Sequence, residues 1–399
     1  MNDTGVLITW CVSRNENGSS GVSTSPSYSS SVFRTMALRV GIVGLPNVGK
    51  STLFNALSEA GAEAANYPFC TIEPNVGVVA IPDPRLYRLA EMAGSKETLS
   101  ATIEFVDIAG LVAGASKGEG LGNKFLAHIR EVDALVHVVR CFEDENVVHV
   151  EASVDSLRDI EIIDTELLLK DLETVAKRKE RVEKQLRIGE KEVKAEAAFL
   201  DRLEGHLSEG KAARLLELSD TEAPMLHSLF LLSSKKMLYV ANVGEGDLPD
   251  GNEHVERIRA RADEEGAGVV VISAEFEAQL ADLPPEDRAE FLEAAGEEES
   301  GLVRLVHAAY ELLGLITYFT AGPKETRAWT ITRGTTAPQA AGVIHTDFEK
   351  GFIRAETIKF ANYDRLGSEA AARDAGAMRS EGKEYVVVDG DVMLFRFNV

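Results

Sequence analysis

Residues 37–57, ALRVGIVGLPNVGKSTLFNAL, contain the pattern that decides the fold. The short run 39–43 is rich in β-branched residues, the motif GxxxxGKS follows at residues 44–51, and a helical pattern begins at residues 52–57. This order of strand, glycine-rich loop and helix is the context that a phosphate-binding loop requires. The sequence therefore predicts an α/β fold built around a nucleotide site.

The residues of this loop have the groups that bind a polyphosphate. Glycines allow backbone N–H groups to close around phosphate oxygens, and the helix N-terminus adds a favourable dipole. Lys50 is expected to contact the β- and γ-phosphates and to act in catalysis, and the Ser51 hydroxyl is expected to bind Mg²⁺. The predicted phosphate-binding residues are Asn47, Val48, Gly49, Lys50, Ser51 and Thr52.

A second motif supports nucleotide binding. Residues 101–106 have a strand pattern, and Asp107-Ile108-Ala109-Gly110 follows it. An aspartate at this place can hold Mg²⁺ through water, and Gly110 can donate its N–H to a γ-phosphate. Between the two motifs, Thr71 lies in a proline-flanked loop that could close on Mg²⁺ as a switch. A purely structural threonine is the alternative.

Position 111 bears on hydrolysis because it is a leucine. Many switch NTPases have a glutamine here that orients the attacking water, which a leucine cannot do. Either the protein hydrolyses nucleotide poorly, or another group positions the water. His128, at the start of an amphipathic helical pattern, is the nearest candidate for that catalytic role. A structural histidine is the competing interpretation.

The stretch MLYVANVGE, residues 237–245, bears on the identity of the base. Guanine-binding proteins usually place Asn-Lys-x-Asp at the end of such a strand, whereas here Val243 and Glu245 follow Asn242. Asparagine can pair with N6 and N7 of adenine, so ATP fits this pattern at least as well as GTP. The predicted base-site residues are Asn242, Val243, Glu245, Ser273 and Ala274.

Composition limits the class of protein. The chain has 399 residues and a net charge of −23, which argues against non-specific coating of nucleic acid. Residues 177–194 are nevertheless rich in Lys and Arg, and residues 316–399 carry equal numbers of positive and negative charges. These two segments could therefore bind RNA without strong electrostatic repulsion. No apolar run approaches the length of a membrane span. Three widely spaced cysteines fit a reducing cytoplasm.

The chain is expected to contain several parts. Apolar residues from Leu168 recur at alternating spacings of four and three, with Lys179 as a polar break, and a return stripe begins at Val193, which predicts an antiparallel helical hairpin. Short strand patterns after Leu315 predict a small α+β domain. We assign residues 1–35 to a disordered extension, 36–154 and 211–314 to a G domain, 155–210 to the hairpin and 315–399 to the C-terminal domain.

The motifs GLPNVGKST, YPFCTIEPN, VDIAGL, GEGLGNKFLAHIREVDA and ANVGE together resemble the Obg-like ATPase family, the YchF branch of the translation-factor GTPase class. The resemblance covers about residues 36–399. It implies a G domain that prefers ATP, an inserted coiled-coil hairpin and a C-terminal TGS domain of β-grasp fold. Leu111 and His128 match the hydrophobic replacement and the histidine that the family is thought to use. Asn47 matches an asparagine that holds K⁺ in some relatives.

The resemblance also implies a ribosomal partner. From the distribution of charge we expect the basic hairpin tip and the TGS domain to contact it, and we expect no membrane partner and no specific DNA. We therefore expect an ATP-hydrolysing switch. A conventional GTPase associated with translation is one alternative, and a nucleotide-dependent scaffold with negligible turnover is another. A P-loop metabolic kinase would need an arginine-bearing lid, which the sequence between the motifs does not offer.

Overall fold

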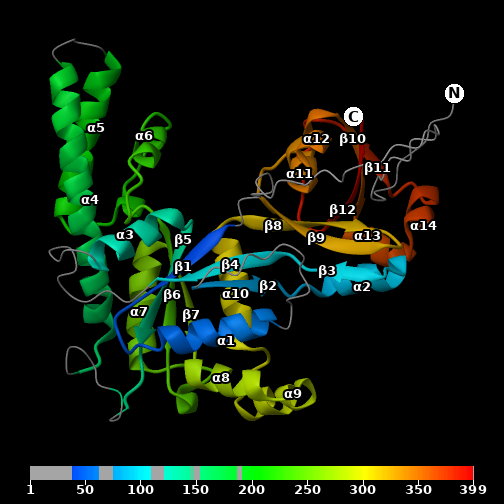
Figure 1. Cartoon of the computed structure of the whole chain (residues 1–399), viewed down its shortest axis with the longest axis horizontal. Coiled ribbons are helices and arrows are strands. Elements are labelled where there is room, and N and C mark those ends of the chain that lie inside the picture. Colours follow the sequence, from blue (N-terminus) through cyan, green and yellow to red (C-terminus); the bar gives the residue numbers. More distant parts are fainter. Residues whose placement is uncertain are drawn as a thin grey trace, which may run out of the picture. The chain divides into compact units, whose positions relative to one another are not determined.

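The computed structural model describes residues 38–62, 75–108, 121–144, 147, 153–186 and 191–398 (Figure 1). These residues form two compact units. The first consists of Leu38–Val79 and Ile103–Leu313, and the second includes Ala80–Thr102 and Gly314–Val399. None of the helices in this part of the chain has the length and apolarity needed to cross a membrane.

A six-stranded sheet with the order β2-β4-β1-β5-β6-β7 is the centre of the first unit. Its strands are β1 (Arg39–Val43), β2 (Val76–Ala80), β4 (Thr102–Asp107), β5 (Ala134–Arg140), β6 (Lys236–Asn242) and β7 (Gly268–Ile272). The neighbouring pairs from β4 to β7 are parallel. Strand β5 is buried along its whole length, as is typical of a sheet covered on both faces. The carboxyl ends of these strands therefore meet at one edge, where α/β proteins bind their ligands.

Helices pack around this sheet. They are α1 (Lys50–Ala62), α3 (Leu121–Glu131), α7 (Glu253–Glu265), α8 (Ala274–Asp282), α9 (Pro285–Ala294) and α10 (Gly301–Leu312). Helices α7 and α10 pack against β6 and β7, and α1 packs against α8. Side chains of Asn252, Ser273 and Ser300 accept hydrogen bonds from the first turns of α7, α8 and α10, which satisfies otherwise unpaired N–H groups and fixes where each helix begins.

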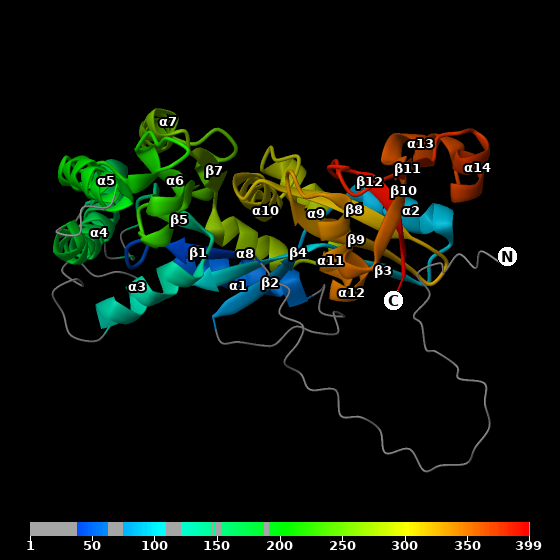
Figure 2. The same ribbon diagram turned by 90° about the horizontal axis from the view of Figure 1, so that it is seen from above.

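Two long helices, α4 (Ser156–Leu186) and α5 (Lys191–Ser208), lie side by side as the predicted hairpin (Figures 1 and 2). Their shared core includes Leu168, Val175 and Leu200 from the predicted apolar stripes. Lys179, the polar break in the first stripe, pairs across the hairpin with Asp201 at 2.6 Å. The break is therefore an ion pair between the two helices.

The hairpin is joined to the sheet through a buried carboxylate. Asp171 of α4 accepts hydrogen bonds from the backbone N–H groups of Leu232 and Ser233, each at 2.8 Å, and from the Ser233 hydroxyl. These residues precede β6. The helical pattern of residues 222–233 forms only the short helix α6 (Ala223–Ser228), and the positive φ of 49° at Phe230 is incompatible with its continuation.

The second unit contains a mixed sheet with the order β11-β10-β12-β8-β9-β3. Its strands are β3 (Glu97–Leu99), β8 (Leu315–Ala321), β9 (Glu325–Thr332), β10 (Phe352–Lys359), β11 (Arg379–Glu381) and β12 (Asp391–Phe397). Its helices are α2 (Pro84–Ala93), α11 (Ala337–Ile344), α12 (Thr346–Lys350), α13 (Phe360–Leu366) and α14 (Glu369–Asp374). The core between α11 and the sheet includes Tyr318, Ala340 and Phe395.

The second unit includes a segment that the sequence analysis placed in the G domain. Residues Ala80–Thr102 contribute α2, which buries Leu86 and Leu89, and β3, which pairs in parallel with β9. Their apolar pattern shows an amphipathic helix but does not show which sheet the helix covers. The observed unit therefore differs from the assigned range 315–399.

Candidate functional site

The glycine-rich loop after β1 approaches neighbouring parts of the chain so closely that two of its glycines have no room for a side chain. A Cβ atom on Gly44 would lie 2.4 Å from the carbonyl oxygen of Val138, and one on Gly49 would lie 2.2 Å from Nδ2 of Asn242. Both glycines have positive φ, 152° and 93°, which L side chains rarely adopt. The loop conformation therefore depends on glycine at both positions.

Lys50 begins α1 at the end of this loop. Its side chain is buried, and its ammonium group donates a 2.5 Å hydrogen bond to the carbonyl oxygen of Leu45 inside the loop. Burial lowers the pKa of Lys50 to about 8, although the nearby charge of Asp107 raises it. A phosphate would favour the charged form in the same way as Asp107, because an opposite charge stabilises the ammonium group.

Asp107 ends β4, next to β1 in the sheet. Its Oδ1 atom is buried and has no hydrogen-bond partner among the described residues. Burial raises the pKa of Asp107, and the charge of Lys50 opposes this shift. A buried carboxylate oxygen without a donor is suited to a water molecule or a hydrated cation, because burying an unpaired acceptor is otherwise unfavourable.

The buried side chain of Asn242, at the end of β6, connects the phosphate loop to the segment after β7. Its Nδ2 donates to the carbonyl oxygen of Val48 at 2.9 Å, and its Oδ1 accepts from the backbone N–H of Ala274 at 2.9 Å. An asparagine amide has two donors and two acceptor positions, so each end retains capacity for one further hydrogen bond. Asn242 can therefore bond to the two loops and still form hydrogen bonds with a base.

The other predicted base-site residues have different environments. The Val243 side chain is buried, and its backbone N–H bonds to Ile272 at 2.8 Å. Glu245 is exposed at the start of the 3₁₀ turn Glu245–Asp247. Ser273 is buried and accepts a hydrogen bond from Phe276 as the cap of α8. The structure therefore places the ends of β6 and β7 beside the phosphate loop.

The remaining predicted site residues fall into two groups. Asn47 has a positive φ of 62°, Ser51 and Thr52 lie exposed in the first turn of α1, and Val48 is buried. The residues outside the described part of the chain are Thr71, Gly110 and Leu111.

His128 has a different position in its helix from the one predicted. It lies exposed in the last turn of α3, together with Arg130, whereas the sequence pattern placed it at the start of a helix. The pattern was misinterpreted because glycines at 118, 120 and 122 obscured where the helix begins. The buried face of α3 includes Leu126 and Ile129.

Sequence reasoning missed the backbone acceptors that shape this site. The carbonyl groups of Leu45 and Val138 contact the loop, yet a carbonyl group leaves no signal in a residue pattern. The double contact of Asn242 was also missed, because its two partners come from segments far apart in the chain.

Comparison with known families gives two matches. Residues 39–173 match the family described as "50S ribosome-binding GTPase". Residues 315–398 match the family YchF-GTPase_C, which is described as a protein of unknown function.

Several curated proteins are similar over most of this chain. "Ribosome-binding ATPase YchF" of Bacillus subtilis is 54% identical over 91% of this chain and 100% of its own length. "Obg-like ATPase 1" of Oryza sativa subsp. japonica is 45% identical over 91% of this chain and 92% of its own. The solved Schizosaccharomyces pombe YchF GTPase is 41% identical, covers 90% of this chain and 98% of its own, and superimposes with a TM-score of 0.82. These matches confirm the expected fold class: a P-loop G domain, a helical insertion and a C-terminal β domain.

Replacing Gly49 with alanine is expected to weaken nucleotide binding. The new methyl group would displace the Asn242 amide and would require a strained backbone, which together cost about 2 kcal/mol, or roughly a thirtyfold loss of affinity. Titration with a fluorescent ATP analogue measures the change. Gly205→Ala is the matched control, because nothing lies within 4 Å of its added methyl group in α5. Wild-type affinity in the Gly49→Ala protein would contradict this account of the loop.

Proposed function

The chain belongs to the YchF and Obg-like ATPase family, and from this membership we propose that it is an ATP-hydrolysing molecular switch that associates with the ribosome. One observation carries the proposal: the amide of Asn242 joins the phosphate loop to the segment after β7, while its neighbours differ from the guanine-binding motif. Relatives are named both as ATPases and as GTPases, so the choice of nucleotide needs its own argument and test.

The phosphate half of the site supports hydrolysis. The loop presents the ammonium group of Lys50, which would leave the carbonyl of Leu45 to contact the β- and γ-phosphates. His128 is the proposed group that orients the attacking water, in place of the glutamine that Leu111 replaces.

Mg²⁺ fits the residues present. The Ser51 hydroxyl would hold the ion directly together with Thr71, and the unpartnered Oδ1 of Asp107 would accept from one of its water ligands. Bound Mg²⁺ would neutralise phosphate charge. Asn47 is the proposed ligand for K⁺, because it matches an asparagine that holds K⁺ in some relatives.

The base half of the site favours adenine. Asn242 retains one donor and one acceptor position, which match N7 and N6 of adenine. Val243 supplies no cation to pack over the ring. The carboxylate of Glu245 extends one methylene further than the aspartate that binds the guanine N1–H and N2–H₂ groups.

The protein is expected to bind ATP more tightly than GTP, as measured by titration of the nucleotide-free protein with each. Glu245→Asp should raise the relative affinity for GTP severalfold, because it restores the carboxylate of the guanine motif. This substitution is a cleaner test than one at Val243, since Glu245 is exposed whereas a lysine at 243 would have to be buried. Equal or tighter GTP binding by the wild-type protein would favour a conventional GTPase.

Lys50→Ala and Ser51→Ala are expected to abolish ATP hydrolysis through lost phosphate and Mg²⁺ contacts. His128→Ala should lower kcat by roughly a hundredfold and leave ATP affinity nearly unchanged, because a group that orients water acts mainly in the transition state. Steady-state phosphate release and nucleotide titration separate these effects. His128→Gln should retain part of the turnover, since glutamine can orient water. Normal turnover in His128→Ala would assign this histidine a structural role, and undetectable wild-type turnover would favour a binding scaffold.

The proposed partner is the ribosome, contacted through the hairpin and the C-terminal domain in the cytoplasm. A protein of net charge −23 needs local basic surface to approach RNA, and the hairpin supplies it. Co-sedimentation should show ribosome binding that weakens steadily with salt, because cation–phosphate contacts release counterions. Absence of wild-type protein from the ribosomal pellet at low salt would contradict the proposed partner.

A further inference from the structure

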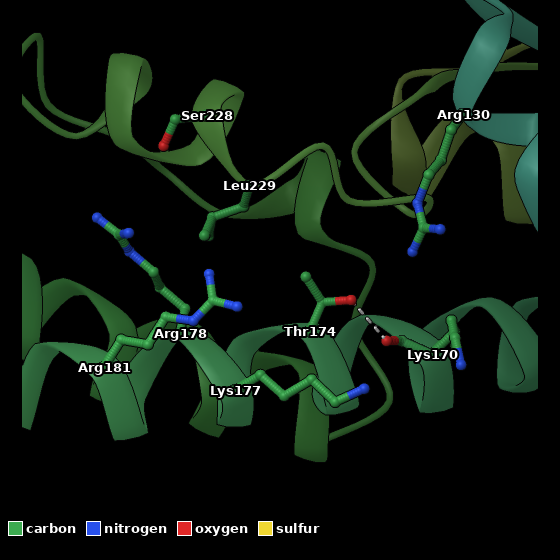
Figure 3. Close-up of a pocket in the computed structure, with 8 residues that line it drawn as sticks. All are labelled: Arg130, Lys170, Thr174, Lys177, Arg178, Arg181, Ser228 and Leu229. Carbon is green, nitrogen blue, oxygen red and sulfur yellow. Dashed lines mark hydrogen bonds between the residues drawn. The ribbon is translucent and has the colours of Figure 1, made fainter.

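A groove of about 640 Å³ lies along the hairpin in the first unit (Figure 3). One wall is α4, and the end of α6 and the last turn of α3 face it. The lining residues are Arg130, Lys170, Thr174, Lys177, Arg178, Arg181, Ser228 and Leu229. Five of these side chains carry positive charge and none carries negative charge.

The cations of the groove are only partly paired. Lys170 pairs with Glu173, and Arg178 pairs with Glu196 of α5 at 2.6 Å. The other three, Arg130, Lys177 and Arg181, are exposed and form no ion pair with a carboxylate among the described residues. Along α4, the basic residues follow one another at spacings that place them on one side of the helix. The groove is therefore a strip of positive charge that carboxylates neutralise only in part.

This strip lies on the side of the hairpin, away from its tip. Lys177 is nine residues before the last residue of α4, Leu186, which corresponds to about 13 Å along a helix. Lys184 lies in the last turn of α4, while Lys191 and Lys194 lie exposed at the start of α5. The basic cluster predicted from the sequence thus divides into a groove part and a tip part.

An exposed aromatic residue comes next in the chain after the groove lining. Phe230 directly follows the lining residue Leu229, is 62% exposed, and has a positive φ of 49°. A bulky residue seldom adopts this backbone conformation, so the ring is held in solvent at a cost in strain. The ring of His227 lies 5.9 Å from it. The residue that follows Leu229 therefore presents a flat apolar surface to solvent.

We propose that this groove binds single-stranded RNA, with phosphates along α4 and Arg130 and a base stacked on Phe230. Positive grooves flanked by aromatic rings bind single strands in this way, without reading sequence. The choice of RNA rests on the proposed ribosomal partner. An acidic peptide fits less well, because Leu229 is the one apolar side chain among the lining residues and a peptide would make no use of the exposed ring.

Fluorescence anisotropy with a labelled single-stranded RNA tests the proposal. Lys177→Glu/Arg181→Glu should weaken binding at least tenfold and flatten the salt dependence, by a slope of about 0.7 for each lost phosphate contact. Arg178 stays unchanged in this variant, since its reversal would face Glu196. Phe230→Ala should weaken binding roughly 5- to 150-fold without changing the salt slope, as loss of one stacked base predicts. Phe230→Trp should retain binding.

The matched control is Lys191→Glu/Lys194→Glu, which makes the same change in net charge near the tip. It should bind RNA within about twofold of wild type, because its charges lie outside the groove. Basal ATP turnover and thermal unfolding show that each variant is folded.

Three outcomes would overturn the inference. The first is absence of RNA binding by the wild-type protein, and the second is equal weakening of RNA binding by the two charge-reversed variants. The third is a Phe230→Ala protein that binds RNA as the wild type does and from which polyglutamate displaces the RNA. This third result would indicate an acidic protein partner. ATP hydrolysis and ribosome co-sedimentation are measured independently of these three outcomes, so the proposed function is judged separately.

Discussion

The side chain of Asn242 makes the contact on which the nucleotide site depends. It is buried, and its two ends hold the carbonyl of Val48 and the N–H of Ala274. The site is therefore assembled from three parts of the chain by one amide. Gly49 must lack a side chain for this amide to reach Val48. Because breaking either contact would leave a buried polar group unpaired, the phosphate loop and the segment after β7 are expected to move together.

The strand that carries Asn242 also connects the site to the hairpin. Strand β6 is buried from Met237 to Asn242. Just before it, Leu232 and Ser233 donate hydrogen bonds to Asp171 of α4. A buried strand paired on both edges has little freedom to bend, so it fixes the hairpin root at one end and the nucleotide loops at the other. This continuity gives a physical basis for the proposed switch, in which the ribosome would contact the hairpin.

A second contact at the hairpin root reinforces this arrangement. Arg214, which follows α5, pairs with Glu265 at the end of α7 at 2.5 Å, and the Tyr239 hydroxyl donates to the same carboxylate at 3.1 Å. Both partners of the ion pair are largely buried. Arg261 pairs with the same carboxylate at 2.5 Å, so removal of Glu265 would deprive two arginines of this partner, which costs more than one pair contributes.

The sequence predicted the local parts of this fold and little of what joins them. The strand, loop and helix around Lys50 follow from glycine positions and periodicity, as does the hairpin seam with Lys179. The partners of Asn242 could not be predicted, because they depend on the order of strands in the sheet. For the same reason, the pattern of Ala80–Thr102 did not show which sheet it joins. The left-handed conformation of Phe230 leaves no trace in residue type, so the helical pattern of residues 222–233 does not show that the helix ends at Ser228.

The groove and the proposed catalytic histidine share one short helix. Arg130 and His128 lie in the same turn of α3, and Arg130 lines the groove with α4. A phosphate held between Arg130 and α4 would restrain the turn that carries the proposed catalytic histidine. Coupling between two sites is reciprocal in binding free energy. If bound RNA changes the affinity of the protein for ATP by some factor, bound ATP must change the affinity of the groove for RNA by the same factor.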